Sequence, residues 1–287
     1  MTETEKIISE TPVLSVRGLE KRYPAFHLEN VGFSLQAGHI MGFIGRNGAG
    51  KTTTLKALLS LIHADGGQIR FFGVNYAGNE KQIRRRVGFA SGGVNYYPRK
   101  KLKDITAVTR GFYDNWDEEA YRRYMSTFAL DEAKKPMELS EGMKVKYNLA
   151  VALSHRAELL ILDEPTSGLD PISRDELLEI FLDLAKAGTA ILFSTHIISD
   201  LEKCADDITY IRGGKIQASG SLDSFLDAYR MLEIPSGLPV PEGALGVSRS
   251  RSGASVLMRA EDTVGMPAGR PSLEDIMIHL EKEKEAE

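Results

Sequence analysis

The stretch that decides the fold is Gly45-Arg46-Asn47-Gly48-Ala49-Gly50-Lys51-Thr52-Thr53. It fits the pattern G-x-x-x-x-G-K-[ST], which is typical of loops that bind nucleotide phosphates. Its glycines have no Cβ, so a phosphate can approach bare backbone and successive N–H groups can turn inward as an anion nest. We expect Lys51 to place a positive charge near the β- and γ-phosphates and the Thr52 hydroxyl to ligate Mg²⁺.

The flanks of this loop have the secondary structure that the pattern requires. Residues 39–44 predict a short buried strand that enters the loop. Residues 53–62 predict a helix that leaves it, because four of its apolar residues, from Leu55 to Ile62, share one face. A strand, a glycine-rich loop and a helix in this order are the context in which such a loop binds phosphate.

Composition narrows the class of protein. The chain has 287 residues and is 42% hydrophobic, which is enough for one large α/β domain and a smaller appendage. A net charge of −4 and a pI of about 6.0 argue against a nucleic-acid binder, which usually carries a basic surplus. The single cysteine, Cys204, rules out an intramolecular disulfide and fits a reducing compartment.

Membrane and secretion signals are missing from the sequence. No stretch approaches the roughly 18 uninterrupted apolar residues of a transmembrane helix. Residues 1–6 are polar and acidic and lack a signal-peptide core. We therefore expect a cytoplasmic protein that reaches a membrane only through a partner.

Further apolar runs predict more strands of a parallel sheet. Residues 159–162 and 190–193 are continuous apolar runs, as expected of strands that are buried on both faces. Residues 175–187, which lie between them, predict an amphipathic helix. The Gly213-Gly214 pair between residues 208–211 and residues 215–217 predicts a hairpin.

Two other regions differ in character. Residues 82–133 are strongly charged and predict a mainly helical subdomain. From about Asp227 the chain becomes rich in Pro, Gly and Ser, and it ends in a predicted helix over residues 272–283. We interpret this tail as a small α+β appendage.

Asp163 and Glu164 follow the predicted buried strand at residues 159–162. In that position Asp163 is placed to hold Mg²⁺, and Glu164 is placed near the γ-phosphate, where it would polarise an attacking water. The alternative is that two acidic residues simply end a strand and begin a solvated turn. The phosphate-binding loop elsewhere in the chain favours the catalytic interpretation.

A second polar segment, Leu139-Ser140-Glu141-Gly142-Met143, precedes a predicted helix. A helix that begins with Ser and Gly offers free N–H groups, a hydroxyl and a favourable dipole to an anion. The alternative is an ordinary Ser N-cap without a ligand.

Taken together, these motifs resemble those of an ATP-binding cassette subunit, the ATPase of an ABC transporter. The resemblance runs from about Leu14 to Ile216 and includes five ordered motifs. These are the Walker A loop at residues 45–53, the L-S-G-G-Q signature at 139–143, Walker B at 159–164, the D-loop at 167–170 and the H-loop at 194–196. Glu141 and Met143 depart from the signature. Residues 112–118 are also similar to bacterial exporters whose ATPase and permease are separate chains.

The resemblance implies an α/β fold with a P-loop ABC ATPase core. It implies a helical subdomain, an N-terminal antiparallel β subdomain and a small C-terminal α+β extension around that core. The expected ATPase domain covers residues 1–225, with the helical subdomain at about 93–155. The expected accessory region covers residues 226–287.

The resemblance also implies ATP and Mg²⁺ as cofactors and assigns roles to residues. Glu164 would be the general base, and His196 would contact the γ-phosphate. Thr52 and Asp163 would hold the metal. The residues that would bind the nucleotide are Tyr23, Gly45, Asn47, Gly48, Ala49, Gly50, Lys51, Thr52 and Thr53, together with Ser140, Gly142 and Asp170.

Two of these roles have structural alternatives. A histidine after an apolar strand often has only a structural part, but the preceding Ser194-Thr195 favours the catalytic role of His196. Tyr23, which would stack on adenine, precedes Pro24 and would otherwise be a core or turn aromatic.

One expected element departs from the family. After the predicted strand at residues 87–90 the family usually has a glutamine that touches Mg²⁺ and links the two subdomains. The aligned positions here are Ser91, Gly92 and Gly93, with Asn95 beyond them. Ser91 or water would have to complete the metal shell.

The family implies that two cassettes pair head to tail when ATP binds. Ser140 and Gly142 of one subunit would close over ATP held by residues 45–53 of the other, in a homodimer or a heterodimer with a second cassette. The expected partner is an integral-membrane permease through which a substrate is exported, and no nucleic acid is expected. The alternatives are a soluble cassette ATPase that acts on ribosomes or DNA, and a regulator without transport. The basic groups at residues 81–86 and 99–103 would meet the permease or anionic lipid, or form a solvated charged face.

Overall fold

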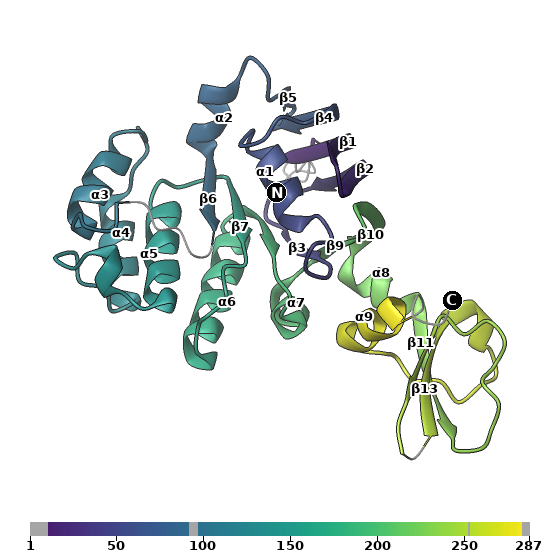
Figure 1. The fold of residues 1–287 in the computed structure, drawn as a ribbon. Coiled ribbons are helices and arrows are strands. Elements are labelled where there is room, and N and C mark those ends of the chain that lie inside the picture. The colour runs from purple at the N-terminus through teal and green to yellow at the C-terminus, as the bar shows by residue number, and fades with distance from the viewer. Residues whose placement is uncertain (1–10, 92–96, 252, 283–287) are drawn as a thin grey trace, which may run out of the picture. The chain divides into compact units, whose positions relative to one another are not determined.

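A computed structural model describes residues 11–91, 97–251 and 253–282 (Figure 1). The chain divides into two compact units. The first unit consists of Met1–His196 and Thr209–Ser219, and the second of Ile197–Ile208 and Gly220–Glu287. Across the described ranges, every helix falls short of the length and apolar content that crossing a bilayer requires.

A six-stranded sheet with the order β10-β9-β3-β8-β7-β6 forms the base of the first unit. Strands β3, β8, β7 and β6 pair in parallel. Every residue of β3 and β8 is buried, as continuous apolar strands between two layers require. The bounds are β3 Ile40–Ile44, β6 Val87–Ser91, β7 Leu159–Asp163, β8 Ala190–Ser194, β9 Asp207–Arg212 and β10 Lys215–Ser221.

A four-stranded antiparallel sheet with the order β2-β1-β4-β5 forms a second layer. Its strands are β1 Leu14–Tyr23, β2 Phe26–Leu35, β4 Gly66–Phe71 and β5 Val74–Asn75. Helix α1, Lys51–Leu58, contributes Leu55 and Leu58 to one apolar core that also contains Leu14 of this sheet and Ile161 of the parallel sheet. The phosphate-binding loop and its helix are therefore fixed by both layers.

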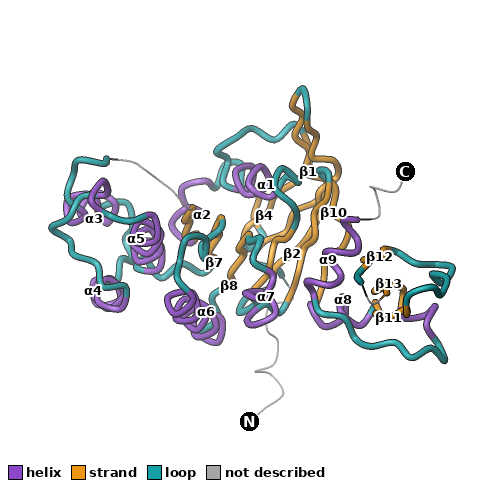
Figure 2. Tube along the Cα trace, turned by 60° about the horizontal axis from the view of Figure 1, so that its bottom comes forward, coloured by secondary structure: helices purple, strands orange, loops and turns teal. Residues whose placement is uncertain are grey.

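Three helices gather at one side of the strands in both views (Figures 1 and 2). They are α3 Leu102–Arg110, α4 Glu118–Thr127 and α5 Glu141–Leu153, with a short 3₁₀ helix, η2, at Pro136–Glu138. Their interface contains a small polar network, in which the Thr106 hydroxyl lies 2.9 Å from the hydroxyls of both Tyr121 and Tyr147. This group corresponds to the helical subdomain that the charged sequence predicted.

Helix α5 packs on β6, and Gly88 of that strand makes this approach possible. A Cβ added at Gly88 would lie 2.6 Å from Cδ2 of Leu160 and 3.0 Å from the carbonyl oxygen of Ala152. Helix α2, Glu80–Arg86, precedes β6, and its Arg86 forms two hydrogen bonds with Glu158, the residue before β7. Gly88 thus sets how closely α5, which carries the signature segment at its N-terminus, lies to the parallel sheet.

The second unit contains a three-stranded antiparallel sheet with the order β11-β13-β12. Its elements are α7 Ile198–Cys204, α8 Leu222–Asp227, β11 Tyr229–Pro235, β12 Gly246–Arg249, β13 Gly253–Arg259, η3 Ala260–Thr263 and α9 Leu273–Lys282. The backbone N–H of Leu273 donates to the Glu202 carboxylate at 2.6 Å and joins α9 to α7. Residues 197–208 cluster with the C-terminal region in this unit, and the expected division into an ATPase domain at 1–225 and an accessory region at 226–287 stays a prediction.

Two helix boundaries differ from the sequence analysis. Helix α1 begins at Lys51 rather than at residue 53 and ends at Leu58 rather than at residue 62, because Ser60 has a left-handed φ of 54°. Helix α6 covers Pro171–Lys186 rather than residues 175–187. Asp170 caps its N-terminus and Pro171 occupies its first position, a start signal that the expected boundary overlooked.

We predict that Gly88→Ala lowers the free energy of unfolding by about 1–3 kcal/mol, because the added methyl overpacks the α5–β6 contact. Gly269→Ala is the matched control, since a Cβ at Gly269 has no neighbour within 4 Å. Urea denaturation followed by circular dichroism measures both. Equal stability of the two variants would contradict the close-approach argument.

Candidate functional site

The phosphate-binding loop needs glycine at two positions because other parts of the chain approach its backbone. A Cβ at Gly45 would lie 2.3 Å from the carbonyl oxygen of Ile211. A Cβ at Gly50, which has a φ of 118°, would lie 2.7 Å from Leu28 Cδ2 and 2.9 Å from Phe26 Cζ. The conformation of the loop is thus imposed by β2 and β9 as well as by its own sequence.

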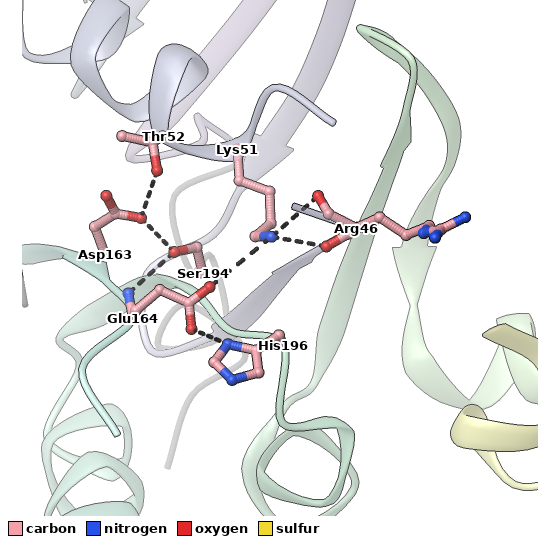
Figure 3. Close-up of polar contacts among 8 residues, drawn as sticks. Arg46, Lys51, Thr52, Asp163, Glu164, Ser194 and His196 are labelled. Carbon is pink, nitrogen blue, oxygen red and sulfur yellow. Dashed lines mark hydrogen bonds and ion pairs between the residues drawn. The ribbon is translucent and has the colours of Figure 1, made fainter. Parts of the chain in front are cut away.

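Lys51 lies at the start of α1 with its side chain 6% exposed. Its ammonium donates to the carbonyl oxygen of Gly45 at 2.7 Å and to that of Arg46 at 3.4 Å (Figure 3). It also lies 3.8 Å from Oε1 of Glu164. Burial lowers the pKa of Lys51, while Glu164 and Asp163 oppose that shift. The loop therefore holds one cation close to the two acidic residues.

Asp163 ends β7 and accepts hydrogen bonds on the same oxygen from two hydroxyls. Thr52 Oγ1 donates to Oδ1 of Asp163 at 3.3 Å, and Ser194 Oγ donates to it at 2.6 Å (Figure 3). Asp163 and Ser194 are neighbours in the parallel register of β7 and β8. The carboxyl ends of adjacent strands thus bring these side chains together, as expected of a ligand site in an α/β sheet.

Glu164 and His196 form the second polar pair of the site. The Nδ1 atom of His196 lies 2.7 Å from Oε2 of Glu164. Glu164 has a left-handed φ of 53°, which is uncommon for a residue with a Cβ. Its carboxylate therefore lies between Lys51 on one oxygen and His196 on the other.

The chemistry of Thr52 and Asp163 fits Mg²⁺, which prefers hydroxyl, carboxylate and water oxygens. The two side chains lie within hydrogen-bond distance of each other, so one small cation can be reached by both. Within the described ranges, no group of three or more His, Cys, Asp or Glu side chains forms a metal cluster. Phosphate oxygens and water would have to supply the other ligands of the metal.

A cavity of about 610 Å³ lies over the phosphate-binding loop. Tyr23, which ends β1, is 44% exposed at this cavity. The residues that line it are Tyr23, Ala25, Phe26, Arg46, Asn47, Gly48, Gly50, Lys51, Thr52, Thr53 and Glu164. Gly45 and Ala49, which belong to the same loop and were also assigned to nucleotide binding, are buried and do not line the cavity.

The three assigned nucleotide-binding residues from the signature segment and the D-loop also lie outside this lining. Ser140 caps α5, and its Oγ accepts from the backbone N–H of Met143 at 3.2 Å. Gly142 packs against the D-loop, where an added Cβ would lie 2.8 Å from the carbonyl oxygen of Gly168. Asp170 caps α6 and accepts from the N–H and the hydroxyl of Ser173, which lower the pKa of its carboxyl. These residues do not reach the cavity of their own subunit.

The sequence analysis named Ser194 within a motif but gave it no role, and it did not identify Phe26 or Ala25. A polar residue at the end of a strand adjacent to Walker B was the available signal for Ser194. Phe26 is brought to the site by the register of the β1–β2 hairpin, in which it pairs with Tyr23, and this register is visible only in the structure. At the missing glutamine, Ser91 pairs in register with Asp163, whereas Gly92, Gly93 and Asn95 lie outside the described residues.

A glycine-rich loop between a buried strand and a helix, with Asp163, Glu164 and His196 at the adjoining sheet edge, defines a P-loop ATPase. The sequence profile of the ABC transporter family matches residues 28–167. The chain belongs to this family as an ATP-binding, ATP-hydrolysing subunit, since relatives that are 34–35% identical align with it over 68–73% of their own length.

Two relatives have defined transport names. The bacitracin transport ATP-binding protein BcrA of Bacillus licheniformis is 35% identical over 73% of this chain and 68% of its own length. The Nod factor export ATP-binding protein I of Burkholderia lata is 34% identical over 75% of this chain and 73% of its own length. A solved ATP-binding subunit of an ABC transporter is 30% identical, with a TM-score of 0.68 over 74% of this chain and 91% of that one.

We predict that Lys51→Ala weakens ATP binding about ten- to a hundredfold, because one charge-assisted hydrogen bond to phosphate is lost. Isothermal titration calorimetry measures the affinity. Lys56→Ala is the control, since Lys56 is exposed on the same helix. Unchanged affinity in Lys51→Ala would count against the phosphate-binding role.

Proposed function

We propose that this chain hydrolyses ATP to power export of a substrate through a separate membrane permease. The observation that carries the proposal is the meeting of four side chains beside the phosphate-binding loop, which are Lys51, Asp163, Glu164 and His196. A cation for phosphate, a carboxylate for a metal and a carboxylate for a water are the parts that phosphoryl transfer to water requires.

The residues divide the work by charge and position. Lys51 and the N–H groups of residues 45–53 would hold the β- and γ-phosphates against the N-terminus of α1. Thr52 and Asp163 would hold Mg²⁺, which neutralises phosphate charge when bound. Glu164 would accept the proton of the attacking water. His196 is within 2.7 Å of Glu164, so it would fix the orientation of that carboxylate and offer its other ring nitrogen to the γ-phosphate.

We infer that two subunits complete each site. Ser140 and Gly142 lie outside the cavity of their own subunit, and they begin a 13-residue helix whose N-terminus offers N–H groups and a favourable dipole to an anion. A two-fold head-to-tail dimer would bring this helix start to the partner's ATP. Hydrolysis would remove the γ-phosphate that joins the halves and allow them to separate.

The transport names of the relatives support a membrane partner and an exported substrate. Because BcrA and the Nod factor export protein are named for transport, a soluble cassette ATPase that acts on ribosomes or DNA is not favoured. The chain would act as a cytoplasmic protein held at the inner face of the membrane by its permease. A homodimer is sufficient, since this chain carries both the phosphate-binding loop and the signature helix.

A second cavity, of about 380 Å³, supports a permease-binding surface. Apolar side chains of β4, α2, β6, α5 and the loop after α1 line most of it, and Leu61 of that loop is 58% exposed. His155 lies in this lining, stacked on Tyr113 at 3.9 Å between ring centroids. Within the described residues neither ring nitrogen of His155 has a partner, and burial lowers its pKa to about 4.

The residues around this cavity would suit a segment of the permease that carries both apolar and polar side chains. Arg84 lies at its edge, and Lys81 and Arg85 are on the same helix, so an acidic or hydroxyl-bearing segment would be complementary. Exposed apolar side chains beside such a hollow are typical of protein interaction sites.

We predict that Glu164→Gln retains ATP affinity, accumulates an ATP-bound dimer and lowers turnover at least about a hundredfold, because the general base is removed. Phosphate release and light scattering after size exclusion measure these effects. Glu179→Gln, on the exposed face of α6, is the control. Parental turnover in Glu164→Gln would exclude the general-base assignment.

We predict that Leu61→Glu abolishes copurification of the chain with an integral-membrane protein from detergent-solubilised membranes, because a carboxylate at the cavity edge opposes apolar contact. ATP affinity should stay parental. Val264→Glu, at an apolar side chain that is 87% exposed in the other unit, serves as the control. Equal copurification of Leu61→Glu and the parent would place the permease contact elsewhere.

A further inference from the structure

Ser194 is a fully buried hydroxyl at the carboxyl end of β8, with 0% of its surface exposed. Its neighbours along the sheet edge are Phe43 of β3 on one side and Asp163 of β7 on the other. It therefore lies between the strand that leads into the phosphate-binding loop and the strand that ends at Asp163, just before Glu164.

The hydroxyl of Ser194 forms hydrogen bonds with both acidic residues, with the side chain of Asp163 and with the backbone of Glu164. It donates to Oδ1 of Asp163 at 2.6 Å, the shorter of the two hydrogen bonds at that oxygen. It also accepts from the backbone N–H of Glu164 at 3.1 Å, and the same N–H donates to the Ser194 carbonyl oxygen at 3.1 Å. A hydroxyl can do both because it has one donor and two acceptor positions.

This arrangement explains two features of the acidic pair. The buried hydroxyl of Ser194 fixes the orientation of the Asp163 side chain. The backbone of Glu164 is left-handed at φ 53°, a conformation that persists only where surrounding contacts hold it. Both contacts come from one residue on the neighbouring strand.

We propose that Ser194 is a positioning residue that orients Asp163 toward the metal and fixes the backbone from which Glu164 extends. The proposal rests on the assignment of Asp163 to the metal under the function proposed above. Ser194 itself touches neither phosphate nor metal in this scheme. Hydrogen-bond partners of metal-ligating carboxylates typically change metal affinity or activity about 10- to 100-fold when they are removed.

The test uses the full chain, ATP and Mn²⁺ in place of Mg²⁺, because carboxylate, hydroxyl and water ligands bind both ions. Electron paramagnetic resonance measures the affinity for Mn²⁺ in the presence of ATP, and calorimetry in EDTA measures metal-free ATP binding. Ser194→Ala should weaken Mn²⁺ binding about tenfold or more and leave metal-free ATP affinity within about twofold. Turnover at saturating ATP should fall with the metal affinity.

Two further variants separate positioning from general damage. Ser154→Ala removes another fully buried serine hydroxyl, which donates to the carbonyl oxygen of Ala150 in α5, and should leave Mn²⁺ affinity parental. Ser194→Thr keeps a hydroxyl at the critical position and should retain Mn²⁺ affinity within about threefold.

Several results would overturn the proposal. Parental Mn²⁺ affinity in Ser194→Ala is one, and loss of metal-free ATP affinity in that variant is another, since it assigns the hydroxyl a merely structural part. A threonine variant that binds metal-free ATP normally but behaves like alanine toward Mn²⁺ is a third. Failure of the general-base assignment can be distinguished from failure of this proposal, because the first is measured by turnover of Glu164→Gln and the second by Mn²⁺ affinity of Ser194→Ala.

Discussion

The parallel register at one edge of the six-stranded sheet is the constraint on which the site depends. Phe43 of β3 pairs with Ser194 of β8, and Ser194 pairs with Asp163 of β7. Because parallel strands end at the same edge, the loop after β3 and the acidic residues after β7 emerge side by side although more than 100 positions separate them in the chain. A shift of one residue in this register would turn Asp163 into the apolar core.

Charge balance then determines how the side chains at that edge lie. The ammonium of Lys51 is buried among backbone carbonyls and next to Glu164, and the other oxygen of Glu164 lies against His196. Asp163 is held separately, by the hydroxyls of Thr52 and Ser194. The two carboxylates therefore have different partners, one cationic and one made of hydroxyls, which is consistent with different roles for adjacent residues of one motif.

Sequence reasoning worked best where the signal was local. The apolar runs located β7 and β8, because a strand that is buried on both faces needs consecutive apolar residues. The glycine pattern located the loop, because close approach to its backbone requires residues without a Cβ. It worked less well at boundaries. Helix α1 ends at Leu58 and helix α6 begins at Pro171, and both boundaries differ from those that the apolar periodicity predicted.

The sequence by itself determined the class of chemistry, since the order and spacing of Lys51, Asp163, Glu164 and His196 indicate a nucleotide-hydrolysing cassette. Only the tertiary structure decided which groups hold those residues in place. It gave Ser194 two acidic neighbours, separated Ser140 from the cavity of its own subunit and stacked His155 on Tyr113 in a mostly apolar hollow. The physical reason is that motifs encode which atoms react, whereas their orientation comes from strand register and packing between segments that are distant in the chain.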